Sequence, residues 1–214
     1  GEEELPRYVE EVIQLRAQYP AIPIRLGIEA DFLPGWEEKT AALLEPYPWD
    51  YVIGSVHILT GWEFDNPKRI EEWDKRDVDE VYHLYFDTLR RSAECGMFDI
   101  IGHTDLVKKF GHRPSKDCSG YIEEAAEAFR QAGVAVELNT SGLRKPVGEM
   151  YPSVDILKVF GQKNLPLVIS SDSHKPEEAG MDFDKAGQLA RQAGFKETVL
   201  FQGRQRVGSL PLPE

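Results

Sequence analysis

The chain has 214 residues, of which 41% are hydrophobic and 29% are charged, a balance typical of a soluble globular protein with a sizeable core. Its 25 Lys and Arg residues against 37 Asp and Glu residues give a net charge of −12, which disfavours a nucleic-acid partner held through its phosphates. No apolar run reaches the roughly 20 residues of a membrane span, and acidic residues stand where a signal peptide would be basic. We therefore expect a cytoplasmic protein.

The apolar pattern predicts strands and helices in alternation. We expect strands at residues 22–32, 50–57, 98–106, 134–140, 165–174 and 198–203. We expect helices at residues 3–17, 36–44, 76–95, 121–132, 153–161 and 183–193. This alternation, without a low-complexity linker, predicts one α/β domain with a parallel sheet over residues 1–214.

Polar side chains gather at the carboxyl ends of the predicted strands. They are Glu29, His57, His103, Asp105, Asn139, Asp172 and His174. In a barrel or an open parallel sheet these ends share one edge, where active sites are built. The sequence therefore predicts that these side chains meet.

The grouped side chains are of metal-ligand types. Imidazole nitrogens and carboxylate oxygens suit zinc, manganese or iron, and a carboxylate such as Glu29 can bridge two ions. Two neighbouring ions clamp a phosphoryl group and lower the pKa of a bound water. Phosphoester hydrolysis is the chemistry that this ligand set favours.

Six segments carry a resemblance to a known family. The segments GIEADF (27–32), VIGSVH (52–57), IGHTDL (101–106) and SDSHKP (171–176) resemble motifs of the polymerase and histidinol phosphatase (PHP) superfamily. The segments KKFGHR (108–113) and NTSGLR (139–144) resemble its histidinol-phosphatase branch. The resemblance implies a distorted (β/α)7 TIM-like barrel with two or three divalent metal ions at its carboxyl-end rim. It also implies hydrolysis of L-histidinol phosphate to L-histidinol and phosphate, a step of histidine biosynthesis.

The resemblance also implies roles for individual residues. Glu29 resembles the bridging carboxylate, and we expect Glu29 and Asp172 to take part in catalysis. The expected metal ligands are Glu29, His57, His103, Asp172 and His174.

Cationic groups must hold the phosphate oxygens, and an arginine fork does so in bidentate geometry. Arg144 is the first candidate and Lys108 the second, although Lys109 or Arg113 could take the place of Lys108. Ser55 precedes His57 by two residues and would face the same side of a strand, either to bind substrate or to serve as a buried hydroxyl.

Asp105 lies two residues beyond His103 and could orient its ring.

The sequence also departs from the family pattern. The family begins with a strand bearing an HxH motif and continues with a second strand ending in an Asp-His pair, and neither is present here. We therefore expect an incomplete barrel, missing its first two strands, with unpaired edges. The missing strands would come from a longer polypeptide or from a second chain.

Two other functions stay open at this stage. One is a phosphoesterase acting on nucleotides or DNA ends, which the net charge disfavours for DNA. The other is a catalytically incomplete fragment that serves as a binding module.

Overall fold

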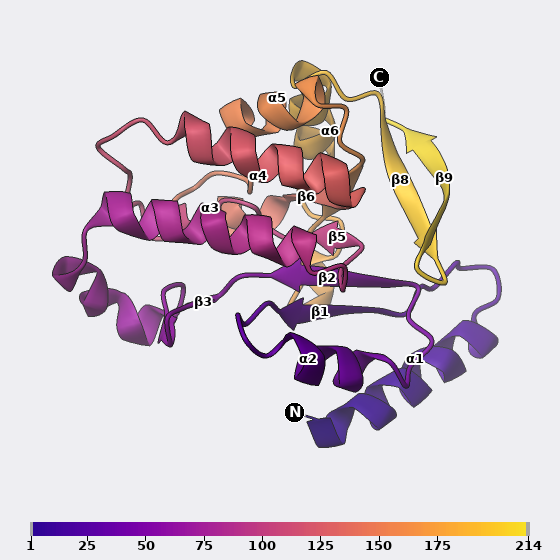
Figure 1. Cartoon of the computed structure of the whole chain (residues 1–214). Coiled ribbons are helices and arrows are strands. Elements are labelled where there is room, and N and C mark those ends of the chain that lie inside the picture. Colours follow the sequence, from indigo (N-terminus) through magenta and orange to yellow (C-terminus); the bar gives the residue numbers. More distant parts are fainter. Residues whose placement is uncertain (1, 213–214) are drawn as a thin grey trace.

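Five short strands form a parallel sheet at the centre of the computed structural model, which describes residues 2–212 (Figure 1). In spatial order they are β1 (Gly27–Asp31), β2 (Tyr51–Ser55), β5 (Ile100–Ile101), β6 (Ala135–Asn139) and β7 (Leu167–Ser170). Each neighbouring pair is parallel, so all five carboxyl ends lie on one edge of the sheet. Five of the six predicted strands are confirmed as members of this sheet.

Six α-helices alternate with these strands. They are α1 (Leu5–Gln18), α2 (Glu37–Leu44), α3 (Val78–Glu94), α4 (Ser119–Ala132), α5 (Val154–Gln162) and α6 (Phe183–Gln192). Short 3-10 helices occupy the connections: η1 (Glu2–Glu4), η2 (Pro67–Lys75), η3 (Leu106–Lys108), η4 (Thr140–Arg144) and η5 (Pro176–Glu178).

Local sequence explains where helices begin and end. The Asp77 side chain accepts hydrogen bonds from the amides of Asp79 and Glu80, which starts α3. Gly133 adopts a φ of 70° and ends α4. All six predicted α-helices are confirmed.

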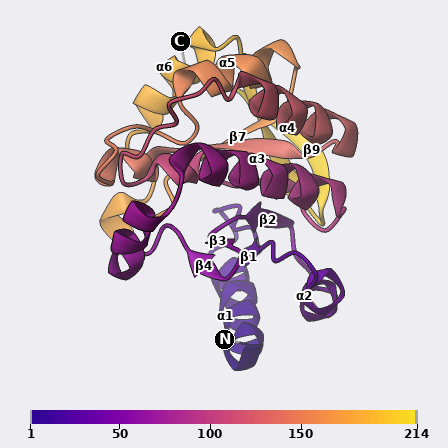
Figure 2. The same ribbon diagram turned by 60° about the vertical axis from the view of Figure 1, so that its left-hand side comes forward.

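The main core lies between the sheet and one layer of helices. Figure 2 shows α3, α4, α5 and α6 together on one side of the molecule, and α1 and α2 near β1. Alternate strand residues such as Val52 and Val136 are fully buried with Tyr85 of α3 and Phe129 of α4. This packing fixes the sheet, and therefore fixes where each strand ends.

A hairpin covers part of the opposite face of the sheet. Its strands β8 (Glu197–Gln202) and β9 (Gln205–Pro211) pair antiparallel, and Phe201 packs against Ile100 and Ala135. The prediction that residues 198–203 extend the parallel sheet is therefore wrong. The reason is local: Gly203 and Arg204 both adopt positive φ angles of 55° and 62°, as in the tight turns that reverse a hairpin.

Side chains of the sheet tie this hairpin down. Arg204 donates from Nε to Asp99 at 3.0 Å, and its backbone N–H donates to the carbonyl of Asp50 at 2.9 Å. The Gly203 amide donates to the Asp50 carboxylate at 3.1 Å. The turn is thus held at the amino-end side of β2 and β5.

A second small hairpin follows β2. Its strands are β3 (Ile58–Leu59) and β4 (Trp62–Glu63), joined by Thr60 and Gly61, which also adopt positive φ angles. It leads into η2 and places Asp65 near the carboxyl edge of the sheet.

The sheet is open. Within residues 2–212, β1 and β7 each have a strand neighbour on one side only. The expected α/β fold with a parallel sheet is confirmed, whereas the absence of two strands from a barrel stays a prediction. In the same part of the chain, no helix combines the length and apolar character needed to span a bilayer. The expected cytoplasmic location stays a prediction.

Candidate metal centre

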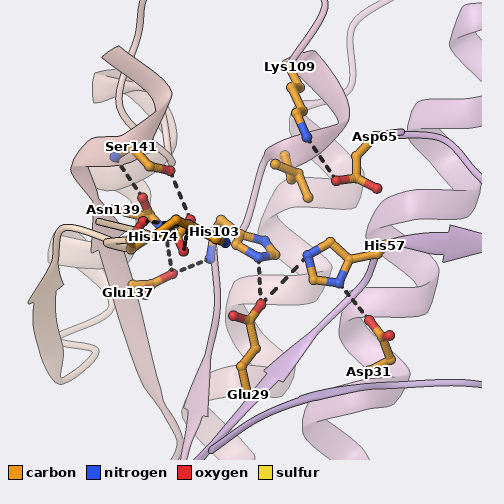
Figure 3. Close-up of polar contacts among 12 residues, drawn as sticks. Glu29, Asp31, His57, Asp65, His103, Lys109, Glu137, Asn139, Ser141 and His174 are labelled. Atoms are coloured by element: carbon orange, nitrogen blue, oxygen red, sulfur yellow. Dashed lines mark hydrogen bonds and ion pairs between the residues drawn. The ribbon is translucent and has the colours of Figure 1, made fainter. Parts of the chain in front are cut away.

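Three predicted ligands meet at the carboxyl edge of the sheet. Glu29 lies on β1, His57 follows β2 and His103 follows β5, and each offers one ligand atom within 4.8 Å of the others (Figure 3). His103 Nε2 lies 3.0 Å from Glu29 Oε1, and His57 Nε2 lies 3.6 Å from the same oxygen. One carboxylate oxygen therefore stands between two imidazoles.

A carboxylate that the sequence analysis did not assign fixes one of these rings. Asp31 Oδ1 lies 2.6 Å from His57 Nδ1, so the other ring nitrogen faces Glu29. A carboxylate on the outer nitrogen of a ligating histidine sets its tautomer and orientation. The signal was present in the sequence, because Asp31 is two residues beyond Glu29 and so shares its side of the strand.

The charges of Glu29 and His103 are strongly coupled. Burial alone would raise the pKa of Glu29, but the hydrogen bond and charge of His103 outweigh it and lower that pKa to about 2. Burial alone would lower the pKa of His103, but Glu29 raises it to about 9. The pair is therefore ionic at neutral pH, and a metal ion held by His103 would have to displace the proton from its ring.

A second polar group lies beside the first, around the predicted catalytic residue Asp172. Its Oδ2 accepts hydrogen bonds from Asn139 Nδ2 at 3.3 Å and from Ser141 Oγ at 3.0 Å. Asn139 Nδ2 also donates to Glu137 at 3.2 Å, and Glu137 accepts the backbone N–H of His103 at 2.7 Å. A chain of hydrogen bonds thus joins Asp172 to His103, and Figure 3 shows its Asn139, Glu137 and His103 members.

His174 does not join the Glu29 cluster. Its side chain is 76% exposed, and its Nδ1 lies 3.1 Å from the carbonyl oxygen of Asp172. Neither Asp172 nor His174 falls within the 4.8 Å group of Glu29, His57 and His103. The structure brings together three of the five expected ligands and places the other two on the loop after β7, where Asp172 is linked to His103 through Asn139 and Glu137.

Arg144 lies next to the same loop. Its Nη2 donates to the Ser171 carbonyl at 2.6 Å, and its Nε lies 3.9 Å from Glu178. Its Nη1 is buried and has no hydrogen-bond partner among the described residues. Nη2 is therefore anchored beside Asp172, whereas Nη1 makes no hydrogen bond to the described residues.

Lys108 does not join the cluster. It is 1% exposed, and its ammonium contacts Asp105 at 2.8 Å, Glu149 at 3.2 Å and the Met150 carbonyl at 2.7 Å. Three acceptors match the three donors of an ammonium group. Its contacts join the β5 loop to the segment before α5.

Lys109 and Arg113, the other two cationic candidates, are also engaged in ion pairs. Lys109 pairs with Asp65 at 2.9 Å, and Figure 3 shows this pair on the side of the site where His57 lies. Arg113 pairs with Glu149 at 2.6 Å.

The structure also places Ser55 and Asp105. Ser55 is fully buried beside Gly102, and a Cβ added at Gly102 would lie 2.6 Å from Ser55 Oγ. Asp105 makes no hydrogen bond to the His103 ring: its Oδ2 accepts from Lys108 and from the Ser153 amide, and within residues 2–212 both its Oδ1 and His103 Nδ1 are buried without a hydrogen-bond partner.

Backbone conformation sets two of these residues apart. His103 has a φ of 21° and Asp172 a φ of 47°, both in the positive region that non-glycine residues rarely adopt. Such strain persists only where surrounding contacts hold it, and it concentrates at functional sites.

Comparisons with known proteins agree with this site. The family description "PHP domain" matches residues 3–141, and the chain belongs to this family. A probable histidinol-phosphatase from Deinococcus radiodurans is 40% identical over 204 residues, covering 95% of this chain and 77% of that protein. The histidinol-phosphatase of Bacillus subtilis is 29% identical over 202 residues, covering 84% and 74%.

Solved structures share the fold. The histidinol phosphate phosphatase of Lactococcus lactis, complexed with Zn, L-histidinol and phosphate, matches with a TM-score of 0.82 at 23% identity, over 95% of this chain and 80% of that one. A putative histidinol phosphatase from Listeria monocytogenes matches with a TM-score of 0.77 at 24% identity, over 86% and 76%. The family resemblance that the sequence motifs carried is confirmed.

Proposed function

We propose that this protein is a metal-dependent phosphomonoester hydrolase that converts L-histidinol phosphate to L-histidinol and phosphate. The observation that carries the proposal is the meeting of Glu29, His57 and His103 at the carboxyl edge of a parallel sheet. The substrate follows from the relatives, which are named histidinol-phosphatases. We further propose that residues 1–214 form one domain of this family.

The donor set fits a divalent metal ion. One carboxylate and two imidazoles are ligands that zinc, manganese and iron accept, and their ligand atoms lie within 4.8 Å of one another. When bound, such an ion would lower the pKa of a water and withdraw charge from a phosphoryl oxygen. Asp172 and His174 are our candidates for holding a further ion beside the first.

The remaining site residues have roles that follow from their contacts. Asp31 keeps His57 Nε2 facing Glu29, so that this nitrogen stays available as a ligand. Arg144 would hold a phosphate oxygen with its uncommitted arm, since an arginine fork matches phosphate geometry. Lys108 is held by three acceptors, and we assign it to supporting the site rather than to touching the substrate. Ser55 stays a candidate for substrate binding, because its Oγ, like Arg144 Nη1, has no hydrogen-bond partner among the described residues.

The test measures metal and turnover together. The purified protein should contain divalent metal by plasma mass spectrometry and should release phosphate from L-histidinol phosphate, and a nucleoside monophosphate serves as the comparison substrate. Dialysis against a chelator should abolish release, and added Zn²⁺ or Mn²⁺ should restore it.

A matched pair of histidine variants sharpens the test. His57→Asn should lose both metal and turnover, whereas His83→Asn should keep both, because His83 lies on α3 against the ring of Tyr121. A metal-free protein that releases no phosphate even with added Zn²⁺ or Mn²⁺ would overturn the proposal.

A further inference from the structure

A buried carboxylate in the middle of the sheet hydrogen-bonds to residues of the candidate metal centre. Glu137 lies on β6, between β5 and β7, and is 3% exposed. Within residues 2–212 it forms no ion pair with a lysine or arginine; burial raises its pKa, and the charge of His103 acts in the opposite direction. Because an unpaired buried carboxylate is costly, its hydrogen bonds must offset that cost.

The first of these hydrogen bonds fixes His103. Glu137 Oε2 accepts the His103 backbone N–H at 2.7 Å, at the residue whose φ is 21°. The contact therefore holds a strained backbone at the residue that supplies one of the three clustered ligands.

The second hydrogen bond leads to the loop after β7. The same Oε2 accepts from Asn139 Nδ2, which also donates to Asp172 Oδ2. The other end of the Asn139 amide is fixed as well, because its Oδ1 accepts the Ser141 backbone N–H at 2.8 Å. One carboxylate oxygen thus ties the end of β5 to the loop after β7, across β6.

We propose that Glu137 is a positioning residue of the metal centre. It holds the His103 backbone directly and the Asp172 carboxylate through Asn139, so that groups from two strands keep the geometry that metal binding requires. The inference rests on the proposed function, since it assumes that His103 binds metal.

Three variants test it in the full chain. Glu137→Met keeps the length of the side chain and removes the acceptor, so the affinity for Zn²⁺ should fall about 10- to 100-fold, the usual cost of losing a group that orients a ligand. Glu137→Gln keeps one carbonyl oxygen for both donors, so its affinity should stay within about threefold of the wild type, far above the Met variant. Asp50→Asn is the matched control, because Asp50 is also a buried carboxylate that accepts backbone amides, but at the opposite end of β2.

The readouts separate positioning from simple stability. Zn²⁺ affinity is measured by competition with a chelator on folded protein, and the urea midpoint is measured separately. Asp50→Asn should lower the urea midpoint and leave Zn²⁺ affinity unchanged. For turnover, Glu137→Met should lower kcat more than it raises KM.

The outcomes also separate this inference from the proposed function. A wild-type protein that binds no Zn²⁺ would overturn the proposed function itself. Equal Zn²⁺ affinities of the wild type and Glu137→Met would overturn only the role of Glu137.

If Glu137→Met does not fold, Asn139→Leu takes its place. This change removes the amide that donates to Glu137 and Asp172 and adds neither a charge nor a metal-ligating atom. Zn²⁺ affinity should again fall, and wild-type affinity would contradict the inference.

Discussion

Replacing Gly102 by alanine should disturb the candidate metal centre by displacing the backbone next to His103. The added Cβ would lie 2.6 Å from Ser55 Oγ and 2.9 Å from Ile53 Cγ2, both on the adjacent strand β2. His103 is the next residue along the chain, so any shift of the backbone at Gly102 moves a predicted ligand.

The magnitude follows from these distances. Ordinary contact would require Ser55 and residue 102 to separate by about 0.8 Å, and packed interiors resist such shifts. Overpacking of this kind costs about 1–3 kcal/mol of stability. Metal sites tolerate shifts of only about 0.2 Å in ligand distance, so Zn²⁺ affinity should fall as well.

The assay is urea unfolding together with Zn²⁺ titration of Gly102→Ala, Ser55→Ala and the double variant. Because Ser55→Ala removes the nearer clashing atom, the double variant should recover part of both losses, with a coupling of about 0.5–3 kcal/mol in stability. A Gly102→Ala protein with wild-type stability and Zn²⁺ affinity would refute the reasoning, and so would purely additive losses.

Three further predictions concern charged groups. Burial alone would raise the pKa of Asp50, but two backbone amides and Arg16 lower it, so Asp50→Asn should cost about 1.5–3 kcal/mol at pH 7. The stability that a lowered carboxyl pKa contributes is fully present only above the pKa of the unfolded state. The difference in unfolding free energy between wild type and Asp50→Asn should therefore shrink as the pH falls below about 4. A difference that stays constant down to low pH in urea unfolding would contradict this. Asp31→Asn should weaken Zn²⁺ binding about tenfold in a chelator competition, because His57 loses its orienting charge; unchanged affinity would count against that contact. Arg204→Met should lower the urea midpoint and leave kcat unchanged, because Arg204 holds the hairpin to Asp99; a parallel fall in kcat would show that the hairpin supports the site.

The parallel sheet and its helices could be predicted because their signals are local. Apolar runs such as residues 134–140 are continuous enough to indicate strands buried on both faces, and polar residues mark where each strand ends. The strand expected at 98–106 contains only Ile100–Ile101 in the sheet, because the backbone turns at His103. The strand Gln205–Pro211 is exposed throughout and shows no apolar alternation, so it carried no signal.

The sequence predicted the metal-ligating residues of the site better than the residues that hold them in place. Glu29, His57 and His103 were found because they end strands of a parallel sheet. Whether Lys108 or Lys109 points into the interior depends on the 3-10 helix Leu106–Lys108. The sequence alone does not indicate which side chains of that helix are buried. Glu137 was missed because a carboxylate inside an apolar strand gives no sign of which backbone amide it will accept.

The docked hairpin has a consequence for the order of folding. Gly203 donates to a carboxylate 153 residues earlier in the chain, so this contact closes a very long loop. Such a contact forms after β2, β5 and β6 have assembled the surface on which Phe201 rests, because loop closure is unfavourable until other contacts offset it. We therefore expect the apolar surface around Ile100 and Ala135 to stay exposed until residues 197–211 are synthesised, and exposed apolar surface of this kind favours self-association.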